Sequence, residues 1–563
     1  MVARAVLVAA LSLVVLPGAA EDSSASYAVV CDAGSTGTRA YVYSLAGGVG
    51  ARVQAQRAAK VKPGLSTFGG RPHEAVDYLM ELVADATPLV PAHLRAQTPL
   101  FVRATAGMRL IPEHEQQAVY DALFAGLRNR QAQGEPGVGA VPFLIRREQF
   151  ATLTGDEEGF FGLLAVNYLK GVIGADLMPD LRRPDLATAL THRKYMDGKP
   201  WVIGALDLGG SSTQISFSAL RGTPTDGSGH SRPFEPRDAY VHSYLGIGAE
   251  LSRAMVQEHY ASRAVAKQAD RIDFPCFFPG FELEVVHRST GLLDGRISGS
   301  GPRITLVGSG NATECSAAIA AVVLGRPLAT YARGGLVPVS NPPVAACLSP
   351  PCGIGNVSQP PVGGLDFLAM SMHFYAVDCM RTLLPPSSAA SAALRDRWPQ
   401  PSIDDISRAA VDWCQLTWSQ LSAGQLGTHP LTSPEKLPHR CYDANYVATL
   451  LGPSGFGIST HEQRVTFSLE VDGTEVEWTL GAFLHSRLHS SATTAVDRLH
   501  AVSGPTSAVT MPANDVVVSS SGYLQSGGWL SALLLGAALW KYSTRRRRVP
   551  IGAAHKMKAM RVP

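Results

Sequence analysis

The sequence predicts an α/β protein, and two observations support this fold class. Between residues 27 and 217, short apolar stretches typical of strands alternate with segments that carry apolar residues at helical spacing. Two strand–turn–strand units with closely similar polar turns also occur far apart in the chain. The 563 residues, 45% hydrophobic and 17% charged, indicate a globular protein with more than one core rather than a disordered one.

One of the two units is the stretch from Ala205 to Phe217, which reads ALDLGGSSTQISF. An apolar run leads into Asp207, two glycines and three hydroxyl residues, and strand-like alternation then resumes. Consecutive glycines let backbone N–H groups approach an anion, hydroxyls add donors, and a carboxylate can face a cation. The pattern predicts a hairpin whose tip holds a phosphate and its divalent cation.

The other unit, from Tyr27 to Tyr43, reads YAVVCDAGSTGTRAYVY and repeats this arrangement around Asp32. A single loop of this kind could equally be an ordinary glycine turn. Two facing loops, however, can clamp a polyphosphate from both sides, with Asp32 and Asp207 converging on one cation. The pair therefore favours phosphate binding.

Between the two loops we expect helices to alternate with strands. Apolar residues at helical spacing predict helices over His73 to Leu82 and Gln117 to Leu127. Strands are predicted over Leu100 to Thr105 and Phe143 to Ile145. The first of these strands leads into the sequence ATAGMR, at the carboxyl end of a strand, where open α/β sheets bind their ligands.

The sequence TGDEEG, from Thr154 to Gly159, opens a helix that continues from Phe160 to Leu169. Acidic residues in a first helical turn are favoured by the helix N-terminus, so they can be simple capping residues. A carboxylate at a strand-to-helix turn beside two phosphate loops is also suitably placed for a general base that activates water. Both interpretations apply to Glu157 and Glu158.

The two ends of the chain predict a type I single-pass membrane protein. Residues 1–20 have the layout of a cleavable secretory signal, with a retained N-terminal anchor as the alternative. Residues 523–542 form an apolar stretch followed by the basic run Arg545 to Arg548, which predicts a transmembrane helix with a cytosolic tail. A buried helix or a lipid-anchor signal would be the alternatives. The bulk of the chain would then face the lumen or the outside.

The cysteines and the charge agree with such a compartment. The eight cysteines include no CxxC pair, so the sequence shows no zinc-binding pattern. The net charge of +3 gives no reason to expect nucleic-acid binding. We expect Cys31 to be a buried thiol and leave Cys379 unassigned. The expected disulfides are Cys276–Cys315, Cys347–Cys352 and Cys414–Cys441, and the glycosylation acceptors by sequence are Asn311 and Asn356.

Taken in order, these motifs resemble the successive signatures of the apyrase family, the ecto-nucleoside triphosphate diphosphohydrolases. The resemblance covers residues 27 to about 490 and rests on DAGSTGTR (Asp32–Arg39), ATAGMR (Ala104–Arg109), GDEEG with NYL (Gly155–Gly159, Asn167–Leu169), DLGGSSTQI (Asp207–Ile215), HSYLG (His242–Gly246), CYDANY (Cys441–Tyr446) and WTLG (Trp478–Gly481). Ser211 departs from the family's usual alanine, Cys31 precedes the first aspartate, and Phe161 to Leu163 stand where a tryptophan often follows.

The resemblance implies two ribonuclease-H-like lobes of the actin and sugar-kinase type, with the nucleotide in the cleft between them. Lobe I would comprise residues 27–150 and 460–505, and lobe II residues 151–459. A linker (506–522), the transmembrane helix (523–542) and a basic tail (543–563) would follow.

The resemblance also implies roles for individual residues. Glu158 matches the proposed general base, with Glu157 ranked second. Asp32 and Asp207 match the aspartates that hold a hydrated Ca²⁺ or Mg²⁺, and Trp478 a tryptophan near that cation's water shell. Ser212 and Gln214 would position the attacking water, and Thr105 would border the terminal phosphate. The residues that bind the phosphates would be Ser35, Thr36, Gly37, Gly209, Gly210, Ser211 and Ser212. Tyr375 and Tyr446 are candidates for stacking on the nucleobase, with packing in the protein core as the alternative.

The expected activity is the metal-assisted hydrolysis of nucleoside tri- or diphosphates, without a covalent intermediate. Two other functions would use the same loops: an ATP-binding chaperone or sugar kinase of the same superfold, and a surface receptor that binds nucleotide without hydrolysis. The signal peptide and the glutamate of the third signature argue against the first. The full set Asp32, Glu158, Asp207 and Ser212 argues against the second.

Overall fold

The computed structural model describes residues 25–46, 52–133, 140–180, 201–218, 220, 222–287, 301–325, 331–332, 335–336, 350–424 and 426–488. The predicted signal peptide, linker, transmembrane helix and basic tail lie outside these ranges, as does Cys347. Within them, no helix is both long enough and apolar enough to cross a membrane.

The first sheet has five strands in the order β3-β2-β1-β4-β5. Strands β1 and β2 form an antiparallel hairpin that β3 extends, whereas β4 and β5 join on the other side of β1 in parallel. The strands are β1 (Ser26–Ala33), β2 (Thr38–Leu45), β3 (Val53–Val61), β4 (Leu100–Ala104) and β5 (Phe150–Thr152).

The second sheet repeats this topology in the order β8-β7-β6-β14-β15. Its first hairpin is again antiparallel and its last two strands again join in parallel. The strands are β6 (Gly204–Leu208), β7 (Ser212–Phe217), β8 (Tyr240–Leu245), β14 (Phe367–Ala369) and β15 (Val465–Phe467). The predicted α/β class and both predicted hairpins are therefore confirmed, and the two polar tips occupy equivalent positions in the two sheets.

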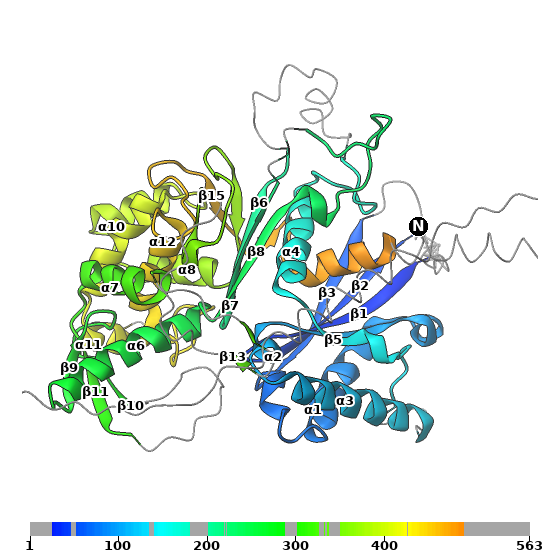
Figure 1. The fold of residues 1–563 in the computed structure, drawn as a ribbon, viewed down its shortest axis with the longest axis horizontal. Coiled ribbons are helices and arrows are strands. Elements are labelled where there is room, and N and C mark those ends of the chain that lie inside the picture. Colours follow the sequence, from blue (N-terminus) through cyan, green and yellow to red (C-terminus); the bar gives the residue numbers. More distant parts are fainter. Residues whose placement is uncertain are drawn as a thin grey trace, which may run out of the picture. The chain divides into compact units, whose positions relative to one another are not determined.

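Helices cover both faces of the first sheet (Figure 1). On one face, α1 (Glu74–Ala86) and α3 (Glu113–Gln133) bury their apolar stripes, including Leu79, Leu82 and Leu123, against the strands. On the other face lie α4 (Gly155–Leu169) and a helix that begins at Trp478 and is described to residue 488. The core around α4 also contains Ala205 and Leu368 of the second sheet, so this helix joins the two sheets.

The second sheet carries the larger set of helices. The elements are α6 (Ala249–Ala266), α7 (Ala312–Ile319), α8 (Met372–Leu383), α9 (Ala389–Asp396), α10 (Ile403–Cys414), α11 (Trp418–Gly424) and α12 (Arg440–Leu451), with a small sheet of β9 (Arg271–Phe274), β10 (Glu282–Val286) and β11 (Arg303–Gly308). Shorter elements are α2 (Ala106–Arg109), β12 (Tyr331–Ala332), β13 (Gly335–Leu336), β16 (Glu470–Val471) and β17 (Thr474–Glu475).

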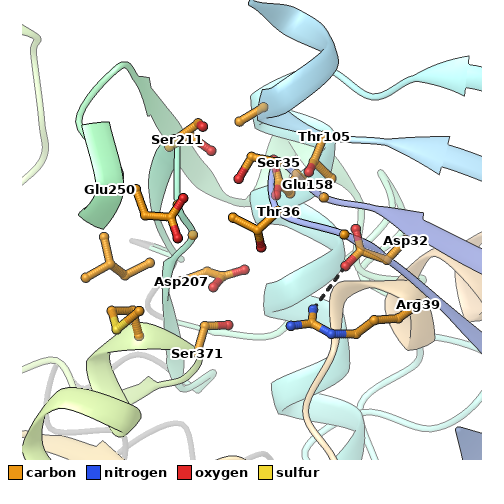
Figure 2. Close-up of a pocket in the computed structure, with 18 of the residues that line it drawn as sticks. Asp32, Ser35, Thr36, Arg39, Thr105, Glu158, Asp207, Ser211, Glu250 and Ser371 are labelled. Carbon is orange, nitrogen blue, oxygen red and sulfur yellow. Dashed lines mark hydrogen bonds and ion pairs between the residues drawn. The ribbon is translucent and has the colours of Figure 1, made fainter. Parts of the chain in front are cut away.

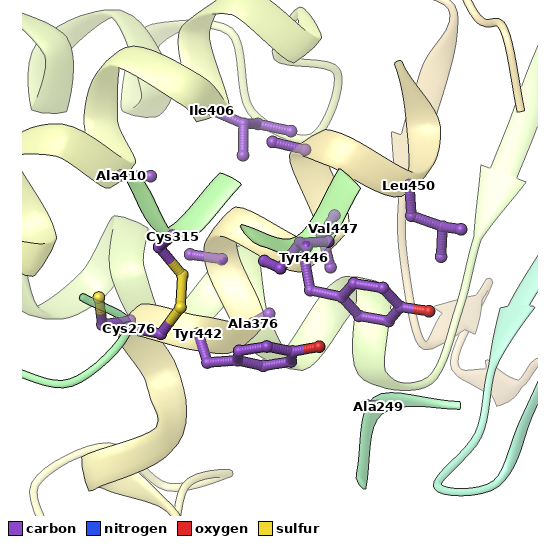
Figure 3. Packing of buried hydrophobic residues seen from close by; sticks show 14 of the residues in the cluster. Ala249, Cys276, Cys315, Ala376, Ile406, Ala410, Tyr442, Tyr446, Val447 and Leu450 are labelled. Atoms are coloured by element: carbon purple, nitrogen blue, oxygen red, sulfur yellow. A yellow bond between two sulfur atoms is a disulfide. The ribbon is translucent and has the colours of Figure 1, made fainter. Parts of the chain in front are cut away.

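Disulfides fasten these helices to the small sheet and to each other. Cys276 is bonded to Cys315, as predicted (Figure 3). Cys414 is bonded to Cys441, also as predicted. Cys352 is also disulfide-bonded, and its predicted partner lies outside the described residues. Cys31 and Cys379 are free and buried, which confirms the buried thiol expected at Cys31.

Two details of the strands differ from the prediction. Phe143 to Ile145 do not form a strand: Leu144 makes a single bridge to Pro99, just before β4 begins, and the apolar side chains fill the core. The fifth strand is instead β5, where Phe150 to Thr152 pair with the end of β4. Strand β15 lies in the second sheet, although the segment from residue 460 was expected with the first.

Candidate functional site

The two hairpin tips line a single cavity, which we call the phosphate cavity (Figure 2). Each tip is closed by a backbone hydrogen bond, from the Gly34 N–H to the Gly37 carbonyl (3.0 Å) and from the Gly209 N–H to the Ser212 carbonyl (2.9 Å). The tips touch, because a Cβ placed on Gly210 would lie 2.7 Å from Ser35 Oγ. The absence of a side chain at Gly210 leaves room for this close approach.

Asp32 and Asp207 stand at the ends of the first strands of the two sheets and both line this cavity. Burial raises the pKa of Asp32 to about 7, against the opposing charge of Arg39. Burial, together with the charge of Glu158, raises the pKa of Asp207 to about 6. The Oδ1 atom of each aspartate is buried without a hydrogen-bond partner.

Two carboxylates with unpartnered oxygens on one cavity fit a divalent cation, because hard cations prefer oxygen ligands. The described residues include no cluster of three or more His, Cys, Asp or Glu side chains that could hold a metal. Two aspartates alone do not fill a coordination sphere of six or more oxygens, so water or phosphate oxygens would have to supply the rest. This composition suits a cation that arrives with a phosphate substrate.

Glu158 lies in the first turn of α4 and also lines the phosphate cavity. Its side chain is 9% exposed, and its Oε2 accepts hydrogen bonds from Arg109 Nη2 at 2.6 Å and Gln214 Nε2 at 3.0 Å. Arg109 Nη2 also donates to Ser212 Oγ at 3.2 Å. Glu158 is therefore a buried carboxylate held in a fixed network, with one side toward the phosphate loops.

The neighbouring Glu157 has a different environment. Its Oε2 accepts hydrogen bonds from the Thr154 N–H at 2.8 Å and the Thr154 hydroxyl at 2.9 Å, which completes a capping box. Glu157 is exposed and does not line the phosphate cavity. The capping interpretation thus holds for Glu157, whereas Glu158 is the carboxylate that faces the phosphate loops.

The structure brings nearly all of the predicted site residues together. The lining of the phosphate cavity includes Ser35, Thr36, Gly37, Thr105, Gly209, Gly210, Ser211, Ser212 and Trp478, along with the three carboxylates. Gln214 does not line it directly; it is buried behind Ser212, with Nε2 3.0 Å from Ser212 Oγ. It can therefore act on the cavity through Ser212 and Glu158.

The two tyrosines expected as candidates for stacking on the nucleobase lie in different environments. Tyr375 lines the phosphate cavity. The prediction that Tyr446 stacks on the base is wrong, because this residue is fully buried in the core. The centre of its ring lies 5.6 Å from that of Tyr442 (Figure 3), and its hydroxyl donates a hydrogen bond to the Ile247 carbonyl. No face of this ring is open to a base.

Several charged residues of the cavity received no role from the sequence. Those that line the cavity are Arg39, Lys60, Glu250, Lys436 and Glu477. Arg109 does not line it but donates hydrogen bonds to the lining residues Glu158 and Ser212. Arg39 and Arg109 end two of the recognised signatures, which is a signal that could have identified them. Lys60 and Lys436 lie in no such motif. Burial, together with the charges of Arg39 and Lys436, lowers the pKa of Lys60 to about 8.

Arg109 is a positioning residue for Glu158, and this assignment makes a prediction. Arg109→Lys keeps a positive charge but cannot reach Glu158, Ser212 and the Leu153 carbonyl together, as the arginine does. We expect kcat to fall by about tenfold, because the variant loses roughly one charge-assisted hydrogen bond to the catalytic network. KM should change little. Phosphate-release kinetics measure both constants. Arg147→Lys, an arginine paired with Asp121 on the surface, is the matched control, and an equal loss in both variants would contradict the assignment.

Comparisons with known proteins agree with this geometry. The model of the GDA1/CD39 (nucleoside phosphatase) family matches residues 19–501. The chain is 26% identical over 487 residues to the nucleoside-diphosphatase mig-23 of Caenorhabditis elegans, covering 83% of this chain and 78% of that protein. It is 28% identical over 486 residues to human ectonucleoside triphosphate diphosphohydrolase 2, covering 83% of each chain.

Among solved structures, the chain resembles a nucleoside triphosphate hydrolase from Neospora caninum. The TM-score is 0.52 at 15% sequence identity, and the match covers 83% of this chain and 93% of that one. At this level of identity the similarity concerns the fold alone.

Proposed function

Because the chain belongs to the GDA1/CD39 nucleoside phosphatase family and is thus a hydrolase of nucleoside phosphates, we propose that it releases phosphate from nucleoside tri- or diphosphates by metal-assisted attack of water. The observation that carries this proposal is the convergence of two phosphate-loop hairpins, two aspartates and Glu158 on one cavity. These features come from three separate parts of the chain: the first hairpin with Asp32, the first turn of α4 with Glu158, and the second hairpin with Asp207. Their meeting is what a phosphoanhydride hydrolase requires.

The hairpin tips would bind the phosphates. Backbone N–H groups of Ser35, Thr36 and Gly37 would face one side of the polyphosphate, and those of Gly209, Gly210 and Ser211 the other. Thr105, at the end of β4, would border the terminal phosphate. This clamp orients the phosphoanhydride so that the terminal phosphorus is open to attack from the side of Glu158.

Asp32 and Asp207 would hold a hydrated Ca²⁺ or Mg²⁺, with Trp478 beside its water shell. When bound, such a cation neutralises charge that develops on the phosphate oxygens. The unpartnered Oδ1 atoms of both aspartates support this assignment, because buried carboxylate oxygens without a donor are otherwise costly.

Glu158 would act as the general base. Its carboxylate would accept the proton of a water molecule as that water attacks the terminal phosphorus. The bond from this phosphorus to the bridging oxygen would break, and the nucleoside mono- or diphosphate would leave on the opposite side. Ser212 and Gln214 would orient the water, since both belong to the hydrogen-bond network of Glu158. The reaction needs no covalent intermediate.

A substrate panel tests the function. The purified protein is assayed for phosphate release from ATP, ADP, GDP and UDP, with Ca²⁺ and with Mg²⁺ and without added sugar. We expect metal-dependent release from at least one nucleotide. Absence of release from every nucleotide, or release only with a sugar acceptor, would contradict the proposal.

We also propose that the chain is a type I membrane protein with its catalytic part in the lumen or outside the cell. The apolar stretch 523–542 and the basic residues after it support this topology. Protease added to sealed microsomes should remove an epitope tag placed after Pro563 and leave a glycosylated domain, modified at Asn311 or Asn356, intact. Protection of the tag, or a mature protein that still begins at Met1, would require a different topology.

A further inference from the structure

A second cavity lies beside the phosphate cavity and shares none of its residues. It is formed by β1 and β4 of the first sheet, the strand-to-helix turn before α4 and the helix that begins at Trp478. Its volume of about 320 Å³ exceeds the 130 Å³ of the phosphate cavity and lies in the range of small-molecule sites. A site of this size can enclose a small organic molecule.

The walls of the second cavity are largely apolar and aromatic. They include Val30, Phe101, Leu153, Phe161 and Phe483. Phe161 and Phe483 project from two different helices, and Phe101 from the sheet. Aromatic rings from separate elements around one cavity favour a flat, aromatic ligand, because such a ligand can contact more than one of the rings at once.

Arg103 brings a positive charge into these walls. It is half-buried on β4 and lies over the ring of Phe101, 5.6 Å from the ring centre. The structure gives it no hydrogen bond or ion pair within the described residues, whereas the comparably buried Arg109, Arg232 and Arg253 each pair with a carboxylate. Burial lowers the pKa of Arg103, and the charges of Glu157 and Glu148 offset this effect only in part.

The nearest carboxylate does not neutralise Arg103. Glu157 lines the same cavity, but its Oε2 is occupied by Thr154, and it forms no ion pair with Arg103. Glu157 does contribute negative charge at the rim, which repels a doubly charged phosphate more than a singly charged acid. A planar carboxylate also matches the two-pronged guanidinium better than other anions of one charge.

We propose that the second cavity binds an aromatic monocarboxylate, with its acid group paired to Arg103 and its ring between Phe101, Phe161 and Phe483. Such a ligand satisfies the guanidinium and fills the apolar walls together. The site is separate from the proposed catalytic site, so it does not depend on which nucleotide is hydrolysed.

The test uses fluorine NMR of two small probes with the purified full-length protein. The probes are 4-(trifluoromethyl)benzoate and its neutral analogue 4-(trifluoromethyl)benzamide, which have the same shape. We expect the acid to bind about tenfold more tightly than the amide, the effect of one charge-assisted contact. In Arg103→Gln this preference should disappear while the amide binds as before.

Two further variants complete the design. Ala482→Phe narrows the cavity from another element and should weaken both probes. Arg71→Gln removes an arginine that also lies over a phenylalanine ring but is exposed and paired with Glu74, so it should behave as the wild type. Equal binding of acid and amide to the wild type, or a preference for the acid that persists in Arg103→Gln, would overturn the proposal.

Discussion

Replacing Glu158 with glutamine is expected to lower turnover by about 100-fold or more, because a general base typically contributes that much. Glutamine has nearly the same shape and can still accept a hydrogen bond from Arg109, so the network around Ser212 should persist. Nucleotide affinity should therefore change little. Phosphate release measures the first effect, and calorimetric titration of a nucleotide into the inactive variant measures the second.

Glu157→Gln is the matched control, since it changes the adjacent residue of the same helical turn. The glutamine oxygen can still accept from Thr154, so the capping box is kept and activity should stay close to that of the wild type. If Glu157→Gln lost activity and Glu158→Gln kept it, the assignment of the base would be wrong.

The second large effect concerns the cation. Asp32→Asn or Asp207→Asn should raise the metal concentration needed for half-maximal activity by about 10- to 100-fold, the range found when groups that support a metal site are altered. The physical reason is that each change removes a negative charge from a cavity in which the Oδ1 atoms have no other partner. Direct binding of Mn²⁺, followed by electron paramagnetic resonance, should weaken in parallel.

Excess EDTA should abolish activity, and restored Ca²⁺ or Mg²⁺ should recover it. Asp156→Asn serves as the control for loss of one acidic charge, because Asp156 is exposed in the first turn of α4 and does not line the cavity. Full activity in excess EDTA, or unchanged Mn²⁺ binding in both aspartate variants, would exclude a cation held by these residues.

The sequence predicts those parts of the site that short local patterns encode. The DAGSTGTR and DLGGSSTQI stretches specify a hairpin, a glycine tip and a carboxylate within a few residues, and both hairpins form as predicted. Two of the expected disulfides are likewise present. The two hairpin tips meet because two sheets of the same topology pack around α4. No single stretch of sequence encodes this arrangement.

Other features depend on tertiary contacts, which explains why sequence patterns miss them. Arg109, at the end of α2, acquires its importance because α4 and β7 bring Glu158 and Ser212 within its reach. Lys60 and Lys436 reach the cavity from a strand and a turn without a motif. The apolar run of Phe143 to Ile145 looks like a strand, but its side chains fill the core while the next segment, β5, pairs with β4.

Tyr446 shows that sequence patterns also fail to decide whether an aromatic residue faces the ligand or the core. A tyrosine within a recognised signature can face the ligand or the core, and the sequence leaves both open. In the fold, α12 directs Tyr446 inward, where it stacks with Tyr442, while Tyr375 of α8 reaches the cavity. Only the packing of the helices decides between them.

The central claim is that water attacks the terminal phosphorus of a nucleotide held between the two hairpin tips, and isotope labelling tests it most directly. The purified protein hydrolyses a nucleoside diphosphate in water enriched in ¹⁸O, and mass spectrometry measures the label in both products. We predict one ¹⁸O in the released inorganic phosphate and none in the nucleoside monophosphate. Label in the nucleoside monophosphate would place the attack on the other phosphorus and contradict the proposed mechanism.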